Sequence, residues 1–215
     1  MVAASLKKKT PGVVSPAAAA VFCAASAALL VVAAAQLNRL CLYLSPVALA
    51  IVLGYSFAKR FTAAAHLVLG LGLAIAPLGA WVAVAGSFAL PPVLLALAVV
   101  FWVAGFDVIY SLQDEEFDRA EGLRSIPARF GAARALQIAR LFHGATLVLL
   151  YGVFLSVHGG WLFGAAVVVA GGFLVRQHRL VSPADLSRVN AAFFTANGWL
   201  SVAVFVLGAA DVLLR

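Results

Sequence analysis

Six of the eight acidic residues of this chain lie between positions 107 and 121. Asp107, Asp114 and Asp118 are seven and four residues apart, so on one continuous helix they would lie within an arc of about 40°. Three carboxylates on one face repel one another and are costly near a membrane, so they need a cation. Mg²⁺ prefers oxygen ligands and commonly bridges one or two carboxylates to substrate phosphates. The spacing therefore predicts a Mg²⁺–phosphate site, with Asp107 as its deepest carboxylate.

Basic residues accompany this acidic segment. Lys59 and Arg60 end an apolar run, and Arg124 closely follows the carboxylates. Cations beside a carboxylate–metal cluster suit a diphosphate, which carries several negative charges; the alternative is that these residues only anchor helix ends. The remaining acidic residues of the segment are interpreted as a solvated loop. They are Glu115, Glu116 and Glu121.

Composition shows that lipid must be the solvent for much of the surface. Of 215 residues, 65% are hydrophobic and 11% charged, with a mean hydropathy of +1.08, whereas soluble domains are about half apolar and a quarter charged. The net charge of +7 does not indicate nucleic-acid binding, because the charges lie in short gaps between apolar runs. Cys23 and Cys41 are expected to be packing residues. The four histidines lack metal-ligand spacing, so packing or interfacial roles are expected for them.

Seven apolar runs are long enough to cross a bilayer core of about 30 Å as helices. None has the alternation of a barrel strand, so the predicted fold is an all-α, polytopic transmembrane bundle with residues 1–215 in one domain. The predicted spans are Pro16–Leu37, Leu40–Phe57, Ala64–Gly86, Pro91–Leu112, Ala135–Val157, Trp161–Val175 and Val189–Ala210.

The basic residues predict the orientation of this bundle. In a seven-span arrangement, thirteen of the fifteen lie on one side, and only Arg39 and Arg215 lie on the other. Basic residues favour the cytoplasmic side, so the N-terminus is predicted to be cytoplasmic. The first apolar run exceeds twenty residues and is interpreted as a span rather than a signal peptide.

Two segments resemble a known family. Residues 105–131 read GFDVIYSLQDEEFDRAEGLRSIPARFG and closely resemble the second aspartate-rich motif of the UbiA superfamily of intramembrane aromatic prenyltransferases. The match is nearest to the 4-hydroxybenzoate polyprenyltransferase branch and its relatives in menaquinone synthesis. Residues 55–59, YSFAK, are similar to the Tyr-x-x-x-Lys element of the same family.

The resemblance implies a function and a set of site residues. Family members are nine-span bundles that hold a polyprenyl diphosphate with Mg²⁺ between two aspartate-rich motifs on the cytoplasmic side. They transfer the polyprenyl group to a hydroxylated aromatic acid in quinone biosynthesis, which implies a bacterial inner-membrane enzyme. The residues carried over are Asp114 and Asp118 as metal ligands, Asp107 as their support, Lys59 as a diphosphate contact, and Tyr55 and Tyr110 as lining of the catalytic site.

The first aspartate-rich motif of the family, Asn-x-x-x-Asp-x-x-x-Asp, is absent from the sequence, and no acidic residue precedes Asp107. The seven spans correspond to the third to ninth of the family, and residues 5–16 resemble the end of the loop after that motif. The expectation is a fragment or a truncated relative whose Mg²⁺–diphosphate binding is weak or absent in this polypeptide alone. Two other hypotheses remain: a catalytically incompetent remnant, and a transporter in which the carboxylates bind a coupling ion.

Overall fold

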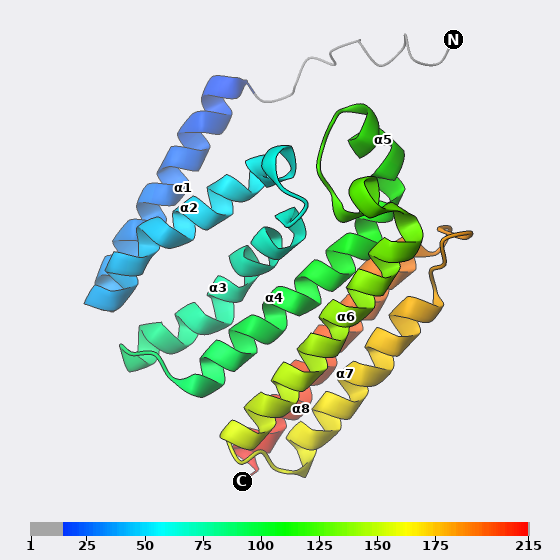
Figure 1. Cartoon of the computed structure of the whole chain (residues 1–215). Helices are drawn as coiled ribbons and strands as arrows, with labels where there is room; N and C mark the ends of the chain where they lie inside the picture. Colours follow the sequence, from blue (N-terminus) through cyan, green and yellow to red (C-terminus); the bar gives the residue numbers. More distant parts are fainter. Residues whose placement is uncertain (1–14, 215) are drawn as a thin grey trace.

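The structure, a computed structural model, describes residues 15–214, which form an all-α bundle (Figure 1). Seven of its helices are long and apolar enough to cross a membrane, which confirms the predicted number of spans. The long helices are α1 (Pro16–Leu37), α2 (Arg39–Phe61), α3 (Ala65–Ala85), α4 (Leu90–Tyr110), α6 (Ile126–Ser156), α7 (Trp161–Arg179) and α8 (Ala196–Leu213). The short ones are the 3₁₀ turn η2 (Ser111–Asp114), the helix α5 (Glu115–Ala120) and the π-helical turn η3 (Ala191–Thr195).

Most predicted span boundaries agree with the helices to within a few residues, but the fifth does not. Helix α6 begins at Ile126, nine residues before the predicted Ala135. Ser125 caps its N-terminus, because the Ser125 hydroxyl accepts a hydrogen bond of 3.3 Å from the backbone N–H of Ala128. The helix is then interrupted at Gly131, whose φ of 77° and ψ of 162° are not helical. The first turns of α6 contain charged residues, so a search for apolar runs could find only the later, apolar part of the helix.

Side chains join the helix ends on the side of the bundle away from the acidic segment. Asn38 caps α2 by accepting from the N–H of Cys41 at 2.9 Å, and its amide donates to the carbonyl of Val82 at 2.8 Å. Asp211 of α8 accepts from the N–H of Gly160 and the N–H of Phe163, at 3.0 and 3.2 Å. These bonds satisfy backbone groups that helix ends leave without partners.

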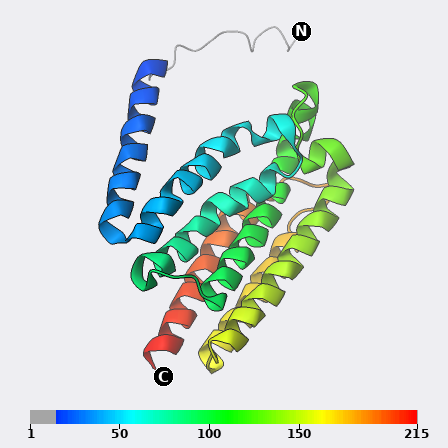
Figure 2. The same ribbon diagram turned by 60° about the vertical axis from the view of Figure 1, so that its left-hand side comes forward.

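Helix α4 lies at the centre of the bundle and α1 at its periphery (Figures 1 and 2). Val103, Ala104, Val108 and Ile109 of α4 are fully buried. In contrast, Ala34 is the one residue of α1 that is buried. The central helix therefore carries Asp107 on its buried final turns and leads directly into the rest of the acidic segment.

Close contact between α3 and α4 depends on Gly70. A Cβ atom at this position would lie 2.3 Å from the carbonyl oxygen and 2.9 Å from the Cα atom of Val100, so the two backbones would have to separate. We expect Gly70→Ala to lower the free energy of unfolding by about 3 kcal/mol, the upper end of overpacking effects. Gly72→Ala is the matched control, because nothing lies within 4 Å of its added Cβ. Thermal unfolding in detergent should show a large fall in Tm for the first variant; equal Tm values for both would contradict the close contact.

Except for Arg39, the basic residues that the structure describes gather toward one end of the bundle. The end of α2, the start of α6 and the link from α7 to α8 all lie at the end that carries α5 (Figure 1). Arg39, at the start of α2, lies at the opposite end. This separation agrees with the predicted loop positions. Lys7, Lys8, Lys9 and Arg215, together with the loop-like residues 5–14, lie outside the described residues.

Candidate functional site

The acidic segment is not one continuous α-helix. Helix α4 ends at Tyr110, and the tighter 3₁₀ turn η2 separates it from α5. The prediction that Asp107, Asp114 and Asp118 share the face of a single α-helix is therefore wrong. Asp107 remains in α4, Asp114 is exposed at the end of the turn, and Asp118 is buried in α5. The break gives each carboxylate a different environment.

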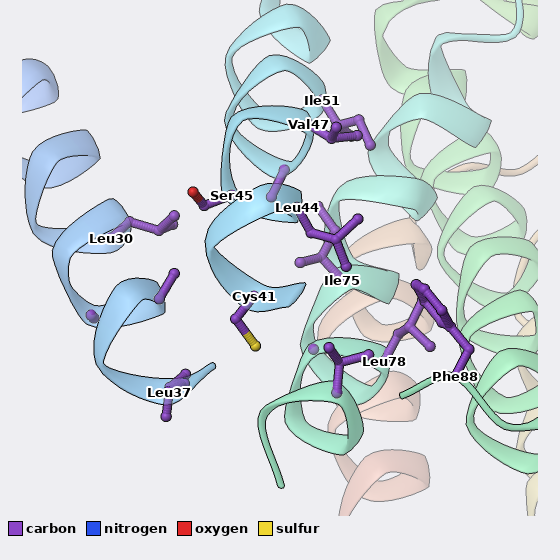
Figure 3. A pocket seen from close by; sticks show the side chains of 15 residues that line it. Leu30, Leu37, Cys41, Leu44, Ser45, Val47, Ile51, Ile75, Leu78 and Phe88 are labelled. Atoms are coloured by element: carbon purple, nitrogen blue, oxygen red, sulfur yellow. The ribbon is translucent and has the colours of Figure 1, made fainter. Parts of the chain in front are cut away.

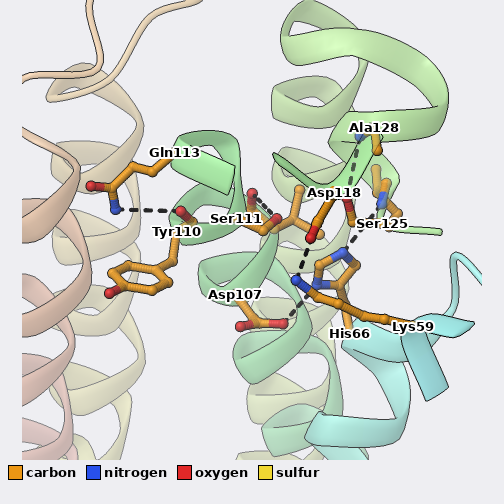
Figure 4. Close-up of polar contacts among 11 residues, drawn as sticks. Lys59, His66, Asp107, Tyr110, Ser111, Gln113, Asp118, Ser125 and Ala128 are labelled. Atoms are coloured by element: carbon orange, nitrogen blue, oxygen red, sulfur yellow. Dashed lines mark hydrogen bonds and ion pairs between the residues drawn. The ribbon is translucent and has the colours of Figure 1, made fainter. Parts of the chain in front are cut away.

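Asp118 forms an ion pair with Lys59. The ammonium of Lys59, at the end of α2, lies 3.1 Å from Oδ2 of Asp118, and the two side chains are 28% and 3% exposed (Figure 4). A carboxylate as buried as Asp118 needs such a partner, because an uncompensated charge is costly out of water. The structure thus brings together a predicted diphosphate contact and a predicted metal ligand that lie 59 residues apart.

Arg124 fastens the loop after α5 to the end of α2. Its backbone N–H donates to the carbonyl of Lys59 at 2.7 Å, and its guanidinium donates to the carbonyl of Phe61 at 3.0 Å. These two bonds and the ion pair of Lys59 with Asp118 are called the clasp below. Arg60, the other predicted diphosphate contact, is exposed, and its guanidinium lies 5.7 Å from the centre of the Phe57 ring on its own helix.

A hollow of about 410 Å³ with three arginines in its lining lies beside the clasp, at the start of α6. Its lining includes Arg119, Arg124 and Arg129, and the N-terminus of a helix carries partial positive charge. Arg119 also bonds to Glu115 at 2.8 Å, which balances part of this charge. The hollow is a surface on which phosphate oxygens would be favourable.

Asp107 pairs with a buried histidine that sequence reasoning missed. Nδ1 of His66 lies 2.6 Å from Oδ2 of Asp107, and His66 is fully buried near the start of α3 (Figure 4). The sequence shows only one histidine at the start of an apolar run, with its partner 41 residues away. His143 and His178, also expected to be packing residues, pair with each other at 2.9 Å.

The two predicted tyrosines come from different helices, α2 and α4. Tyr55 of α2 is half-buried and within electrostatic reach of Asp107. The Tyr110 ring packs against the rings of Phe193 and Phe194, at centroid distances of 4.4 and 6.3 Å. Both tyrosines therefore lie near Asp107. Tyr110, Phe193 and Phe194 together are called the aromatic wall below.

The aromatic wall depends on the π-helical turn η3, which sequence reasoning also missed. The amide of Gln177 donates to the carbonyl of Ala192 at 2.9 Å, and the amide of Asn197 donates to the carbonyl of Phe193 at 2.7 Å. The indole N–H of Trp102 in turn donates to the Asn197 side chain at 3.1 Å. Side chains thus supply partners for carbonyl groups in the wide turn, which occurs frequently at functional sites.

The carboxylates suit a metal ion that binds together with a ligand. Among residues 15–214, no three His, Cys, Asp or Glu side chains are grouped as a metal site would require. Asp114 at the end of η2 and Asp118 in α5 are two carboxylates in this segment, and Mg²⁺ is usually held by one or two carboxylates plus substrate phosphates. The available ligands therefore fit Mg²⁺ brought in with a diphosphate better than a metal held by protein alone.

An apolar groove of about 430 Å³ lies between α1, α2 and α3 (Figure 3). Its lining covers residues Cys41 to Ile51 of α2, in the half of this helix that lies away from Lys59. It also includes Leu30, Leu78 and Phe88. Ser45, whose hydroxyl bonds to the carbonyl of Leu42, is a polar exception. The groove is suited to a hydrocarbon chain rather than to a charged group.

Known proteins resemble the chain in sequence and in fold. Residues 10–201 match the model of the UbiA prenyltransferase family. A 4-hydroxybenzoate octaprenyltransferase of Francisella tularensis subsp. tularensis is 29% identical over 182 residues, and one of subsp. novicida is 31% identical over 174 residues. A solved apo structure of a UbiA homolog from Aeropyrum pernix K1 superposes with a TM-score of 0.84 at 33% identity, and the match covers 95% of this chain and 77% of that one.

Each alignment covers a larger share of this chain than of the relative. The alignment with the first Francisella enzyme covers 83% of this chain and 61% of the relative, and that with the second covers 80% and 60%. The chain thus spans about three fifths of the curated relatives that it matches. The family match nevertheless extends over most of the sequence and over the whole acidic segment. The chain belongs to the UbiA prenyltransferase family.

Proposed function

We propose that this protein transfers a polyprenyl group from polyprenyl diphosphate to a hydroxylated aromatic acid, 4-hydroxybenzoate or a similar phenol, in quinone biosynthesis. The observation that carries the proposal is the ion pair of Lys59 with Asp118 in the family's acidic segment, beside Asp107 and at the end of apolar spans. An amphipathic substrate needs charged groups next to an apolar surface. The two relatives described above are named for the same reaction class.

The charged residues would bind the diphosphate. Asp114 and Asp118 would hold Mg²⁺, which supplies positive charge to the departing diphosphate. Lys59 and Arg124 would contact phosphate oxygens directly, and Arg60 would add charge from the exposed end of α2. Lys59 would exchange part of its bond with Asp118 for the phosphate as the site fills.

The apolar surroundings would protect the reacting carbon. Loss of diphosphate leaves an allylic cation, which water would destroy. Tyr110 and the rest of the aromatic wall exclude water on one side, and Asp107, with Tyr55 beside it, places negative charge near the cation. An electron-rich phenol ring would then attack through the carbon ortho to its hydroxyl, and the proton lost from that carbon would pass to the released diphosphate. The groove along α2 offers room for the polyprenyl chain.

The same proposal places the protein in the bacterial inner membrane with the site toward the cytoplasm. Basic residues at the end of the bundle that carries the acidic segment support this orientation, because cytoplasmic loops are enriched in them. The N-terminus is then cytoplasmic, and residues 1–215 act as one membrane domain whose partners are its two substrates and the bilayer.

The test is a transfer assay with membranes that contain either the 215-residue chain or this chain extended by any in-frame upstream coding sequence. Polyprenyl diphosphate and 4-hydroxybenzoate are supplied, and the product is identified by mass spectrometry. We expect prenylated acid that disappears with a metal chelator and returns with added Mg²⁺. Product from the extended form only would assign this chain to part of an enzyme. No product from either form would refute the proposal, and ion-coupled flux in proteoliposomes would then favour a transporter.

A further inference from the structure

His66 uses both nitrogens of its ring although no solvent reaches it. The side chain is 0% exposed; Nδ1 lies 2.6 Å from Oδ2 of Asp107, and Nε2 receives the backbone N–H of Ile126 at 3.3 Å. The three residues belong to three helices, α3, α4 and α6. This histidine therefore joins the end of the central helix to the first residue of α6.

The contacts define where the ring proton lies. A backbone N–H can only donate, so Nε2 of His66 must accept from Ile126 and carries no proton. A neutral imidazole then has its proton on Nδ1, which must donate to Asp107. Asp107 is accordingly the acceptor of this hydrogen bond. Figure 4 shows its other oxygen turned away from His66, toward the side on which Tyr110 lies.

We infer that His66 is a positioning residue for the prenyl-transfer site: it fixes the orientation of the Asp107 carboxylate and keeps its second oxygen directed at the reacting carbon. The inference rests on the proposed function and names a residue that this function alone does not require. A carboxylate at this depth is costly without a donor, and the Asp107 side chain is only 15% exposed. Lys59 cannot serve both carboxylates equally, because its ammonium is bonded to Asp118 at 3.1 Å.

Three substitutions separate this role from simple packing. In His66→Asn, the side-chain amide can take the place of Nδ1 and still donate to Asp107, but the acceptor for Ile126 is lost. In His66→Gln, the longer side chain can accept from Ile126 but has no donor at the Nδ1 position. His66→Phe removes both bonds and keeps the ring.

We expect the activity of the three variants to depend on whether a hydrogen-bond donor remains at the position of Nδ1. We expect His66→Asn to keep kcat within a few-fold, and His66→Gln and His66→Phe to lose about 10- to 100-fold, as orienting partners of metal ligands do. The KM for polyprenyl diphosphate should change little, because Lys59 and Asp118 are untouched. In thermal unfolding, by contrast, the Tm of His66→Gln should equal or exceed that of His66→Asn. If activity simply follows stability across the three variants, the positioning role is wrong.

A double substitution provides the second test. If His66 acts through Asp107, then His66→Phe combined with Asp107→Asn should be no slower than Asp107→Asn alone. Losses that multiply would show that His66 acts independently and would overturn the inference.

A spectroscopic readout distinguishes failure of the inference from failure of the proposed function. In ¹⁵N-histidine-labelled protein, the signals of His66 are assigned by their loss in His66→Phe, and we expect the proton on Nδ1. A proton on Nε2 would overturn the inference whether or not the protein is active. If the unsubstituted protein forms no prenylated product, the proposed function falls, and with it the assignment of His66 to prenyl transfer.

Discussion

Asp114→Asn is expected to lower the rate of prenyl transfer by about 100-fold or more while leaving the stability of the protein unchanged. The substitution removes a charge and keeps the shape of the side chain. A metal ligand contributes several kcal/mol to the transition state, and each 1.4 kcal/mol corresponds to about tenfold in rate. Asp114 is exposed at the end of η2, so the fold does not depend on its charge. The rate is measured at saturating substrates with Mg²⁺ titrated.

Glu116→Gln is the matched control for this prediction. Glu116 is exposed in the same acidic segment, two residues from Asp114, and the same single charge is removed. If charge density alone attracts Mg²⁺, both variants should lose similar activity. We expect only Asp114→Asn to lose activity and to require a higher Mg²⁺ concentration. Near-normal activity of Asp114→Asn would remove this residue from the metal site.

The second large effect is expected from Lys59→Met, which should abolish most activity and also destabilise the bundle. The first loss arises because the diphosphate loses a direct cation. The second arises because Asp118, 3% exposed, would keep a buried charge without its ammonium partner. Leaving a buried group unpaired costs about 1–3 kcal/mol. Thermal unfolding in detergent and the transfer assay measure the two effects on the same preparation.

Combining Lys59→Met with Asp118→Asn separates these two effects. The double variant removes both charges, so stability should return toward that of the unsubstituted protein. Activity should remain low, because both a predicted diphosphate contact and a predicted metal ligand are missing. A double variant that is less stable than Lys59→Met would mean that the ion pair is not the main stabilising contact of these side chains.

The seven spans could be predicted because a bilayer requires long apolar runs that satisfy their own backbone hydrogen bonds. The boundary of α6 could not, because its first turns are charged and are defined by the Ser125 cap. The 3₁₀ turn between Asp107 and Asp118 was hidden for a similar reason. Its residues are compatible with an α-helix, and the burial of Ser111 and Leu112 in the turn is visible only in the structure.

The candidate site was predictable where residue type alone restricts chemistry. Charged residues next to an apolar run are rare, so Asp114, Asp118 and Lys59 were recognisable from the sequence. His66 was not, since a histidine gains its role only from partners that folding brings to it. The π-helical turn was likewise hidden, because Gln177 bonds to it from another helix and Trp102 orients Asn197 from a third.

The clasp has a consequence for the thermodynamics of ligand binding. Its three bonds connect residues 59–61 to residues 118–124, so the loop that carries Arg124 is held by bonds within the protein itself. Ordering a loop upon binding consumes part of the interaction energy, and preorganisation avoids that loss. Association at this end of the bundle should consequently show a small entropic penalty, with the affinity coming from electrostatic contacts and therefore falling as ionic strength rises.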